Sequence, residues 1–589
     1  MCGIAGVMMR ENRPPEAAVL DRLQAALAHR GPDGRGRHVS GPVGLVSTRL
    51  AIIDLEKGDQ PLSERQGAVL VANGEIYNDP ELRVHLHDVA FQTGSDCESP
   101  LHLYRRKGIA FAEDLRGMYG IAIHDPLAGK LILARDPFGI KPLYFIQTPY
   151  CFAFASEPQA LIAAGLSNRL LRPRACAELF QLKFTTGSET IFAQIHRVLP
   201  GETLVISDGQ ITERRRRSAL PNGAMLTLPY EEALHQLDAI LLDSVAHHLR
   251  SDVPYGVFLS GGIDSSAVAY LMARCSPKPV VAATASFPAS AASDEQAMAR
   301  RIAKAIGAEH HVVEMTERDF WNVAPRVAQA LDDPTTDAAA LPTFMLGEAT
   351  RRGVKVVLTG EGGDEMFCGY SRYCRARRFW GLLGRNSRTR GEFDGLGGAN
   401  ETFEGWREGL DRTEREEARN ERTFVQTLQA VDCMQWLPND LLIKVDRCLM
   451  AHGVEGRTPL LDPLVAGFAF RLPDDMKATA RTSKRLLRDW LSTRLPASEP
   501  YARKIGFNPP VGEWIDARKN LIEALVGLQP GIRELFKRED LRRVFADPIK
   551  YHQAAWSLVY YALWHSHHVL GISADGNIED VLAGARQAA

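Results

Sequence analysis

The sequence predicts two domains of different class, a layered α+β domain at the N-terminus followed by an α/β domain with a parallel sheet. Three observations lead to this prediction. The 589 residues are too many for a single hydrophobic core. Up to about Asp208, short apolar strands alternate with Gly, Pro and Asn turns. After Tyr230, strands alternate with amphipathic helices, which is typical of a doubly wound parallel sheet.

The first domain is predicted to span residues 1–210. Its clearest strands are residues 43–46, 68–72, 120–124 and 130–134, and its helices are residues 15–28 and 99–107. Many strands with few helices favour packed sheets covered by helices.

Residues 211–229 are predicted to be a linker, since they contain the run Arg214 to Arg217 and a Pro-Asn-Gly turn. The arginines suit either phosphate binding or a solvated connector, and the connector is the simpler interpretation.

The second domain is predicted to span residues 230–572. A helix with apolar residues from Leu234 to Leu249 leads to a strand at residues 255–259, and a glycine-rich loop leads to a helix that ends near Arg274. Further strands are expected at residues 280–287 and 355–359, with a helix at 293–307 between them. Residues 411–437, 482–492 and 554–569 are expected to be helical, residues 384–400 to form a mobile loop, and residues 573–589 to be a loose tail.

Composition narrows the class of partner. A formal net charge of -2 gives no basis for binding nucleic acid or an anionic membrane, so small molecules are the expected partners. No apolar run approaches the ~20 residues of a membrane span, and no signal peptide is expected. The nine cysteines are odd in number and contain no CxxC pair, which favours reduced thiols in a cytoplasm.

Cys2 is the first candidate for chemistry. Removal of Met1 would place a thiol nucleophile and a free α-amine on one residue, and the amine can act as its base. Gly3 and Gly6 leave room for a substrate beside the backbone. The alternative is that Cys2 is only a small residue that permits removal of the methionine.

A phosphate cradle is predicted where the first strand of the second domain ends. The segment from Ser260 to Ser266 reads Ser-Gly-Gly-Ile-Asp-Ser-Ser and precedes a helix, so backbone N–H groups, hydroxyls and the helix dipole can face an anion. The sequence contains no Walker A motif. Asp264 instead offers a carboxylate for Mg²⁺ on a pyrophosphate group. A tight structural turn is the alternative.

A second acidic loop follows the strand at residues 355–359 and contains Glu361, Asp364 and Glu365. Ligands of open α/β sheets bind at the carboxyl ends of the strands, so Asp264 and Asp364 are predicted to share the metal ions. Two solvated acidic loops are the alternative.

Both halves resemble the glutamine-hydrolysing asparagine synthetase family, over essentially the whole chain. The resemblance implies an N-terminal-nucleophile glutaminase domain, an αββα sandwich, fused to an ATP-pyrophosphatase domain with a helical C-terminal part. In the first half, Cys2 matches the nucleophile, Asn73 and Gly74 match the oxyanion donors, and three residues match those that hold glutamine: Arg49, Glu75 and Asp96. Arg30-Gly31-Pro32-Asp33 and the segment from Arg135 to Gly139 match further signatures, interpreted as framework.

In the second half, the resemblance extends to the positions that bind ATP and pyrophosphate: Leu259, Ser260, Gly261, Gly262, Asp264, Ser265, Ser266, Ser286, Thr359 and Gly360. Asp364 matches the second carboxylate on the metal side. Glu361 and Lys504 match catalytic residues, the lysine being expected to stabilise charge during adenylation. The resemblance also implies Mg²⁺ with ATP as co-substrate, and a homodimer.

The implied reaction is glutamine hydrolysis at Cys2, adenylation of L-aspartate by Mg-ATP, and formation of asparagine, AMP and pyrophosphate. Thr335 and Thr336 match acceptor-binding residues, but Ala338 stands where relatives of the best-known bacterial enzyme have an arginine. A different carboxylate acceptor, in a natural-product or cell-surface pathway, is therefore a second hypothesis. A catalytically inactive paralogue is a third.

Overall fold

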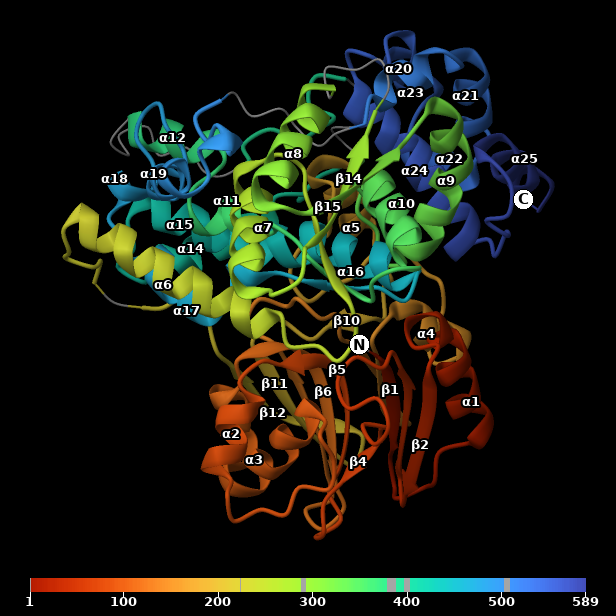
Figure 1. Cartoon of the computed structure of the whole chain (residues 1–589). Helices are drawn as coiled ribbons and strands as arrows, with labels where there is room; N and C mark the ends of the chain where they lie inside the picture. Colours follow the sequence, from red (N-terminus) through yellow and green to blue (C-terminus); the bar gives the residue numbers. More distant parts are fainter. Residues whose placement is uncertain are drawn as a thin grey trace.

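The computed structural model describes residues 2–222, 224–287, 293–378, 388–396, 403–502 and 509–588. The N-terminal half forms the lower part of the molecule in Figure 1 and the C-terminal half the upper part, with the N-terminus at the boundary between them.

Two six-stranded sheets form the N-terminal half, and every strand pair within them is antiparallel. The first sheet has the order β10 (His196–Arg197), β8 (Tyr144–Gln147), β9 (Cys151–Ala155), β1 (Cys2–Met9), β3 (Val43–Arg49), β2 (Gly34–Ser40). The second has the order β12 (Gln210–Arg216), β11 (Glu202–Ser207), β7 (Lys130–Arg135), β6 (Gly117–Asp125), β5 (Val69–Ile76), β4 (Leu62–Ser63).

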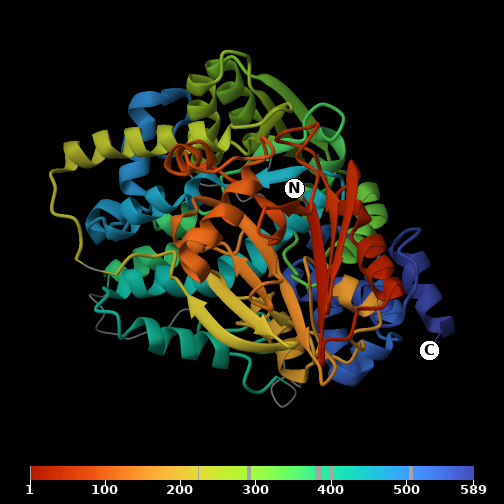
Figure 2. The same cartoon turned by 90° about the horizontal axis from the view of Figure 1, so that it is seen from below.

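Helices cover the outer face of each sheet, which confirms the αββα sandwich (Figure 1 and, seen from below, Figure 2). Helices α1 (Ala17–Ala26) and α4 (Pro158–Ala163) pack on the first sheet, and α2 (Asp79–His85) and α3 (Ser99–Lys107) pack by the second. Ile4, Leu45, Val71 and Leu133 are fully buried between the two sheets. The apolar alternation of these strands therefore supplies both faces with a core.

The C-terminal half contains a parallel sheet, as predicted, and this sheet has five strands. Its order is β15 (Glu309–Glu314), β14 (Val281–Ser286), β13 (Tyr255–Phe258), β16 (Val356–Leu358), β17 (Glu455–Arg457). Helices α6 (Tyr230–His248), α7 (Ile263–Cys275) and α8 (Ser293–Ile306) pack with one face. Helices α10 (Ala340–Thr350) and α16 (Leu442–Met450) pack with the other, so the sheet is doubly wound.

The remaining helices surround this sheet. Those near the acidic loop are α11 (Gly363–Met366), α12 (Ser371–Arg378), α14 (Glu408–Glu417), α15 (Phe424–Val431), the π-helix η4 (Asp432–Leu441), α17 (Pro463–Arg471), α18 (Asp474–Lys477) and α19 (Arg485–Arg494). The C-terminal group packs around α24 (His552–His568) and comprises α9 (Glu317–Ala330), α20 (Val511–Asp516), α21 (Lys519–Val526), α22 (Pro530–Leu535), α23 (Arg538–Ala546) and α25 (Ile578–Ala588). No helix in the described ranges is long and apolar enough to cross a membrane.

The predicted linker begins too early, because β12 continues to Arg216 as the edge strand beside β11. Arg214 pairs across the ladder with Glu202, at 2.9 Å between Nη1 and Oε1. A run of arginines lacks the alternation of apolar and polar residues by which a strand is recognised, so the sequence did not predict this part of β12.

Three other predictions also need correction. The tail forms α25, whose Ile578 and Leu582 are fully buried. The helix predicted at 411–437 is interrupted between Glu417 and Phe424, where Thr423 caps α15. Of the predicted mobile loop, residues 384–387 and 397–400 lie outside the described residues, and the described part is packed, since Phe393 is buried against Phe180.

A buried charge network joins the two halves. Arg30 of the N-terminal half donates to Glu157 at 2.7 Å and to Asp446 of α16 at 2.8 Å. Arg447, the next residue on α16, donates to Asp332 at 2.9 Å and to the backbone oxygen of Ser156 at 3.2 Å. These side chains are all nearly inaccessible, so the halves meet through a desolvated interface.

Candidate functional site

Cys2 opens β1 and lies opposite Arg49 in the register with β3. The residue is 5% exposed, and burial raises the pKa of its thiol. Gln60 Nε2 lies 3.8 Å from Cys2 Sγ, and Gln60 is itself fixed by the backbone N–H of Ala72 at 2.7 Å. The thiol is thus sheltered and oriented at the end of the first sheet.

Asn73 and Gly74 lie next to Cys2 on β5. Asn73 Oδ1 accepts from the Cys2 backbone nitrogen at 3.2 Å, while its Nδ2 is buried and makes no hydrogen bond to any described residue. A buried amide donor without a protein partner is available to a ligand. A Cβ at Gly74 would lie 2.2 Å from the Met118 carbonyl oxygen, so only glycine fits there. The arrangement suits oxyanion stabilisation.

The three residues expected to hold glutamine border the same place. Asp96 Oδ2 accepts from Ile76 N at 2.6 Å, and burial raises the pKa of Asp96 to about 6. Burial and then Asp96 raise the pKa of Glu75, whose Oε1 has no hydrogen-bond partner among the described residues. Arg49 donates to Asp59 at 2.8 Å and to the Asp54 backbone oxygen at 2.6 Å.

The two signature arginines act as framework. The Arg30 Nε lies 3.4 Å from the Cys2 carbonyl oxygen, which the arginine can contact while it pairs with Asp446. Arg135 donates to three backbone oxygens, those of Lys141, Gly139 and Val198, at 2.7–2.8 Å.

Sequence reasoning missed Arg457 of β17, which is fully buried between the two halves. Its Nη2 lies 3.2 Å from Glu75 Oε2, and it donates to Glu455 as well. Its backbone oxygen accepts from Thr359 N at 2.9 Å, so Arg457 contacts the strand end that leads to the acidic loop.

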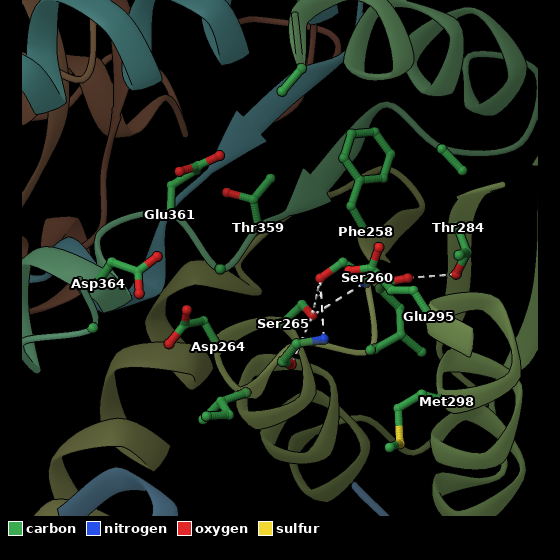
Figure 3. A pocket seen from close by; sticks show the side chains of 18 of the residues that line it. Phe258, Ser260, Asp264, Ser265, Thr284, Glu295, Met298, Thr359, Glu361 and Asp364 are labelled. Carbon is green, nitrogen blue, oxygen red and sulfur yellow. Dashed lines mark hydrogen bonds between the residues drawn. The ribbon is translucent and has the colours of Figure 1, made fainter. Parts of the chain in front are cut away.

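A second site occupies the carboxyl ends of the parallel strands, in a cavity of about 770 Å³ (Figure 3). Gly261 has φ +75° in the loop after β13, and α7 begins directly after Gly262. The Ser260 hydroxyl is 3.0 Å from that of Ser265 and accepts from Gly262 N at 3.3 Å. Backbone and hydroxyl donors at a helix N-terminus make this loop suitable for phosphate.

Three carboxylates gather at one end of the cavity, those of Asp264, Asp364 and Glu361 (Figure 3). A Cβ at Gly363 would lie 2.3 Å from Asp264 Oδ1, and one at Gly369 would collide with Asp364. Glycine at both positions therefore leaves space for the carboxylates. Lys484, which no sequence motif indicated, donates to both Asp264 and Asp364.

These residues fit Mg²⁺ carried by a nucleotide. Magnesium usually takes one or two carboxylates, with phosphate oxygens and water completing its shell. Asp264 and Asp364 provide two carboxylates next to the phosphate loop, and within the described ranges no group of three His, Cys, Asp or Glu side chains forms an all-protein metal site.

Most of the residues predicted to bind ATP line the cavity, and two of them lie behind its wall. Leu259, Ser260, Gly261, Gly262, Ser265, Thr359 and Gly360 line the cavity. Ser266 is fully buried and donates to the Gly262 carbonyl oxygen at 2.6 Å, and Ser286 donates to Gln296 at 3.2 Å. Lys504 lies outside the described residues.

The predicted acceptor residues Thr335 and Thr336 are also fully buried. The Thr335 hydroxyl donates to Asp440, and that of Thr336 accepts from Ser557 at 3.0 Å. Ala338 is 7% exposed in an apolar cluster, and the cavity is lined instead by its neighbours Asp337 and Ala339. An arginine at position 338 would therefore enter apolar packing at this point.

Comparisons with known proteins agree with the two domains. Residues 1–216 match the family described as "Glutamine amidotransferase domain", and residues 236–566 match "Asparagine synthase". A putative asparagine synthetase [glutamine-hydrolyzing] of Mycobacterium tuberculosis is 33% identical, over 93% of this chain and 94% of its own length. Asparagine synthetase [glutamine-hydrolyzing] 1 of Bacillus subtilis is 30% identical over 97% of each chain.

A third relative, amidase chyE of Penicillium rubens, is 33% identical over 63% of this chain and 60% of its own length. Full-length matches together with two matching domain families decide the assignment. The chain belongs to the glutamine-hydrolysing asparagine synthetase family and is an ATP-dependent amidoligase that draws its nitrogen from glutamine.

Proposed function

We propose that this enzyme converts L-aspartate to L-asparagine, with glutamine as nitrogen donor and Mg-ATP as activating substrate. The observation that carries the proposal is that Asp264, Asp364 and Glu361 line the same cavity as the glycine-rich loop from Ser260 to Ser265. A cradle for a departing pyrophosphate beside metal-binding carboxylates suits adenylation of a carboxylate.

At the first site, the thiolate of an N-terminal Cys2 attacks the carboxamide carbon of glutamine. The α-amine of Cys2 takes the proton of the thiol, and Asn73 Nδ2 donates to the oxyanion that forms. The C–N bond then breaks as the same amine gives this proton to the leaving nitrogen, which releases ammonia. Water hydrolyses the thioester to glutamate. Arg49 binds the α-carboxylate of glutamine, while Glu75 and Asp96 bind its α-amine.

At the second site, an acceptor carboxylate oxygen attacks the α-phosphorus of ATP and pyrophosphate leaves. The N–H and hydroxyl donors of the loop hold the departing group. Ammonia then attacks the acyl carbon, and the bond from that carbon to the AMP oxygen breaks with its electron pair going to AMP. The nitrogen loses one proton to water, which leaves the amide. Magnesium held by Asp264 and Asp364 would neutralise phosphate charge. Glu361 and Lys504 are assigned to the acyl-adenylate and to the charge that develops on it.

The test is pyrophosphate release from purified enzyme with ATP, glutamine and a panel of carboxylic acids. Release that depends on L-aspartate, with asparagine formed in equal amount, supports the proposal. The rival function is amidation of another acid, which the match to an amidase and the alanine at position 338 favour. Release with another acid and none with aspartate would establish that rival.

A further inference from the structure

The end of the cavity around Glu361 carries a mixture of charges, and of these only Glu361 has a role assigned in the reaction on ATP. We call it the acceptor end and define it by six lining residues: Lys183, Asp337, Glu361, Trp436, Asp440 and Lys444. Three are carboxylates and two are ammonium groups. A ligand that carries both a carboxylate and an amine would match charges of both signs, and buried charge is costly unless it is paired.

Lys444 is the more buried of the two lysines, with a side chain 5% exposed on α16. Its Nζ donates to Asp337 Oδ2 at 2.6 Å, and the Asp337 carboxylate also accepts from Ala339 N at 3.1 Å. Burial opposes ionisation of Asp337, but Lys444 and then Lys183 hold its pKa below the usual value. An ammonium group has three donors, so a bond to Asp337 leaves others for a ligand.

Lys183 comes from the other half of the molecule, directly after α5 (Pro173–Leu182). Its backbone has φ 81°, and its carbonyl oxygen accepts from Thr336 N at 2.9 Å, which anchors it to the segment before Asp337. The side chain is 24% exposed, and its Nζ lies 3.7 Å from Glu392, beyond hydrogen-bond distance. The ammonium therefore has donors to spare as well.

Asp440 is held between fixed donors. It accepts from the Trp436 indole N–H at 2.6 Å, one π-helical turn earlier, and from the hydroxyl of Thr335. Burial raises the pKa of Asp440, and Lys444 opposes that rise. Lys183, Lys444, Asp337 and Asp440 all line the cavity, so four charged groups surround one space.

We propose that Lys444 and Lys183 bind the carboxylate of the acceptor that is not activated, and thereby restrict this enzyme to small amino dicarboxylic acids. The carboxylates of Asp337 and Asp440 accept hydrogen bonds from the amine of the acceptor. This assignment rests on the proposed function. Lys444 and Lys183 would then provide the positive charge that Ala338 lacks.

The test compares three acceptors in the full-length enzyme: L-aspartate, 3-aminopropanoate, which lacks the second carboxylate, and succinate, which lacks the amine. The variants are Lys444→Met, Lys183→Met and the conservative Lys444→Arg. Lys130→Met, which changes an exposed lysine of β7, is the matched control. Pyrophosphate release gives kcat and KM for each acceptor and for ATP.

Each Met variant at the acceptor end is expected to lower kcat/KM for aspartate by about 10- to 100-fold through KM, as loss of one charge-assisted hydrogen bond would. Activity with 3-aminopropanoate and the KM for ATP should change less than about threefold. Lys444→Arg should recover part of the preference for aspartate. Equal losses with aspartate and 3-aminopropanoate would overturn the proposal, because the lysines would then only hold the structure together.

The same variants separate this inference from the proposed function. A wild-type enzyme that uses aspartate, with variants that keep its KM, refutes the inference alone. A wild-type enzyme that uses another acid refutes the proposed acceptor, and the comparison is repeated with that acid and its analogue lacking one carboxylate. If the purified enzyme shows no turnover, calorimetric titration measures the binding of L-aspartate instead. Loss of binding in both Met variants supports the inference, and unchanged binding refutes it.

Discussion

The Nζ of Lys484 lies 2.5 Å from Oδ1 of Asp364, and the same ammonium group donates to Asp264. Burial opposes its charge, yet Asp264 and Asp364 raise the pKa of Lys484. A charged lysine therefore stands where two carboxylates would otherwise repel each other, in the same cavity as the loop from Ser260 to Ser265.

Lys484→Met should reduce pyrophosphate release by about 100-fold, because both carboxylates lose their buried cation and the leaving group loses a neighbouring positive charge. Hydrolysis of glutamine without ATP should persist. Lys519→Met, which removes a solvated lysine paired with Asp516, is the control. Adenylation that proceeds at the wild-type rate in Lys484→Met would exclude this role.

Cys2→Ala should abolish glutamine-dependent turnover, by at least about 1,000-fold, since no other group can form the thioester. Synthesis from ammonium salts should be retained, because the cavity proposed to bind ATP is separate from Cys2. Cys151→Ala removes a buried thiol from β9 of the same sheet and should spare both activities. Equal loss of both activities in Cys2→Ala would argue against two distinct sites.

Glutamine binding should weaken in acid, because burial raises the pKa of Asp96 to about 6 and the amine of glutamine needs its ionised form. The interaction is present above this pKa and is lost as the pH falls through it. Burial also raises the pKa of Glu75, so acid neutralises this carboxylate as well. Arg250 and Arg457 oppose the rise in the pKa of Asp96, because they favour its ionised form. At pH 5 about one-tenth of Asp96 is ionised, so KM for glutamine should be about tenfold higher than at pH 7.5.

The measurement is glutaminase activity across this range, with Asp96→Asn for comparison. That variant should bind glutamine weakly at every pH and lose most of the acid dependence. A wild-type KM that stays flat down to pH 5 would contradict the assignment.

Arg457→Met should lower the free energy of unfolding by about 3–5 kcal/mol, because it leaves buried carboxylates without their cation. Glu75 would lose its partner at 3.2 Å, so KM for glutamine should rise as well. Urea denaturation and glutaminase kinetics check the two effects. Adding Glu455→Gln should restore part of the stability. Arg471→Met, at a half-buried position whose guanidinium makes an exposed hydrogen bond to the Ala224 backbone oxygen, should change neither quantity by much. Wild-type stability in Arg457→Met would show that the charges are compensated elsewhere.

The pattern of apolar residues predicted the strands and helices that build a hydrophobic core. It did not predict strands that consist mainly of charged residues. The run from Val280 to Phe287 became β14 with its ends shifted by one residue. Strand β17 is only Glu455, Gly456 and Arg457, all buried, and has no apolar alternation to reveal it. Its charges are tolerated because they pair with one another and with the other half of the molecule.

The same contrast holds for the sites. The loop from Ser260 to Ser266 has the local composition of a phosphate-binding loop, and its residues Ser260 to Ser265 line the cavity. Lys183, Lys444 and Lys484 come from three distant segments, and a single lysine has no pattern that separates it from a surface residue. Only the fold brings them together.

The pairing of Arg30 with Asp446 affects any attempt to treat the halves as interchangeable modules. A synthetase half expressed without its glutaminase would expose Asp446 and Asp332 on a surface built to be dry, and a grafted glutaminase from a relative would have to reproduce Arg30 and Glu157 at the same depth. Recombination between family members should therefore succeed only when the crossover carries these four charges as one unit.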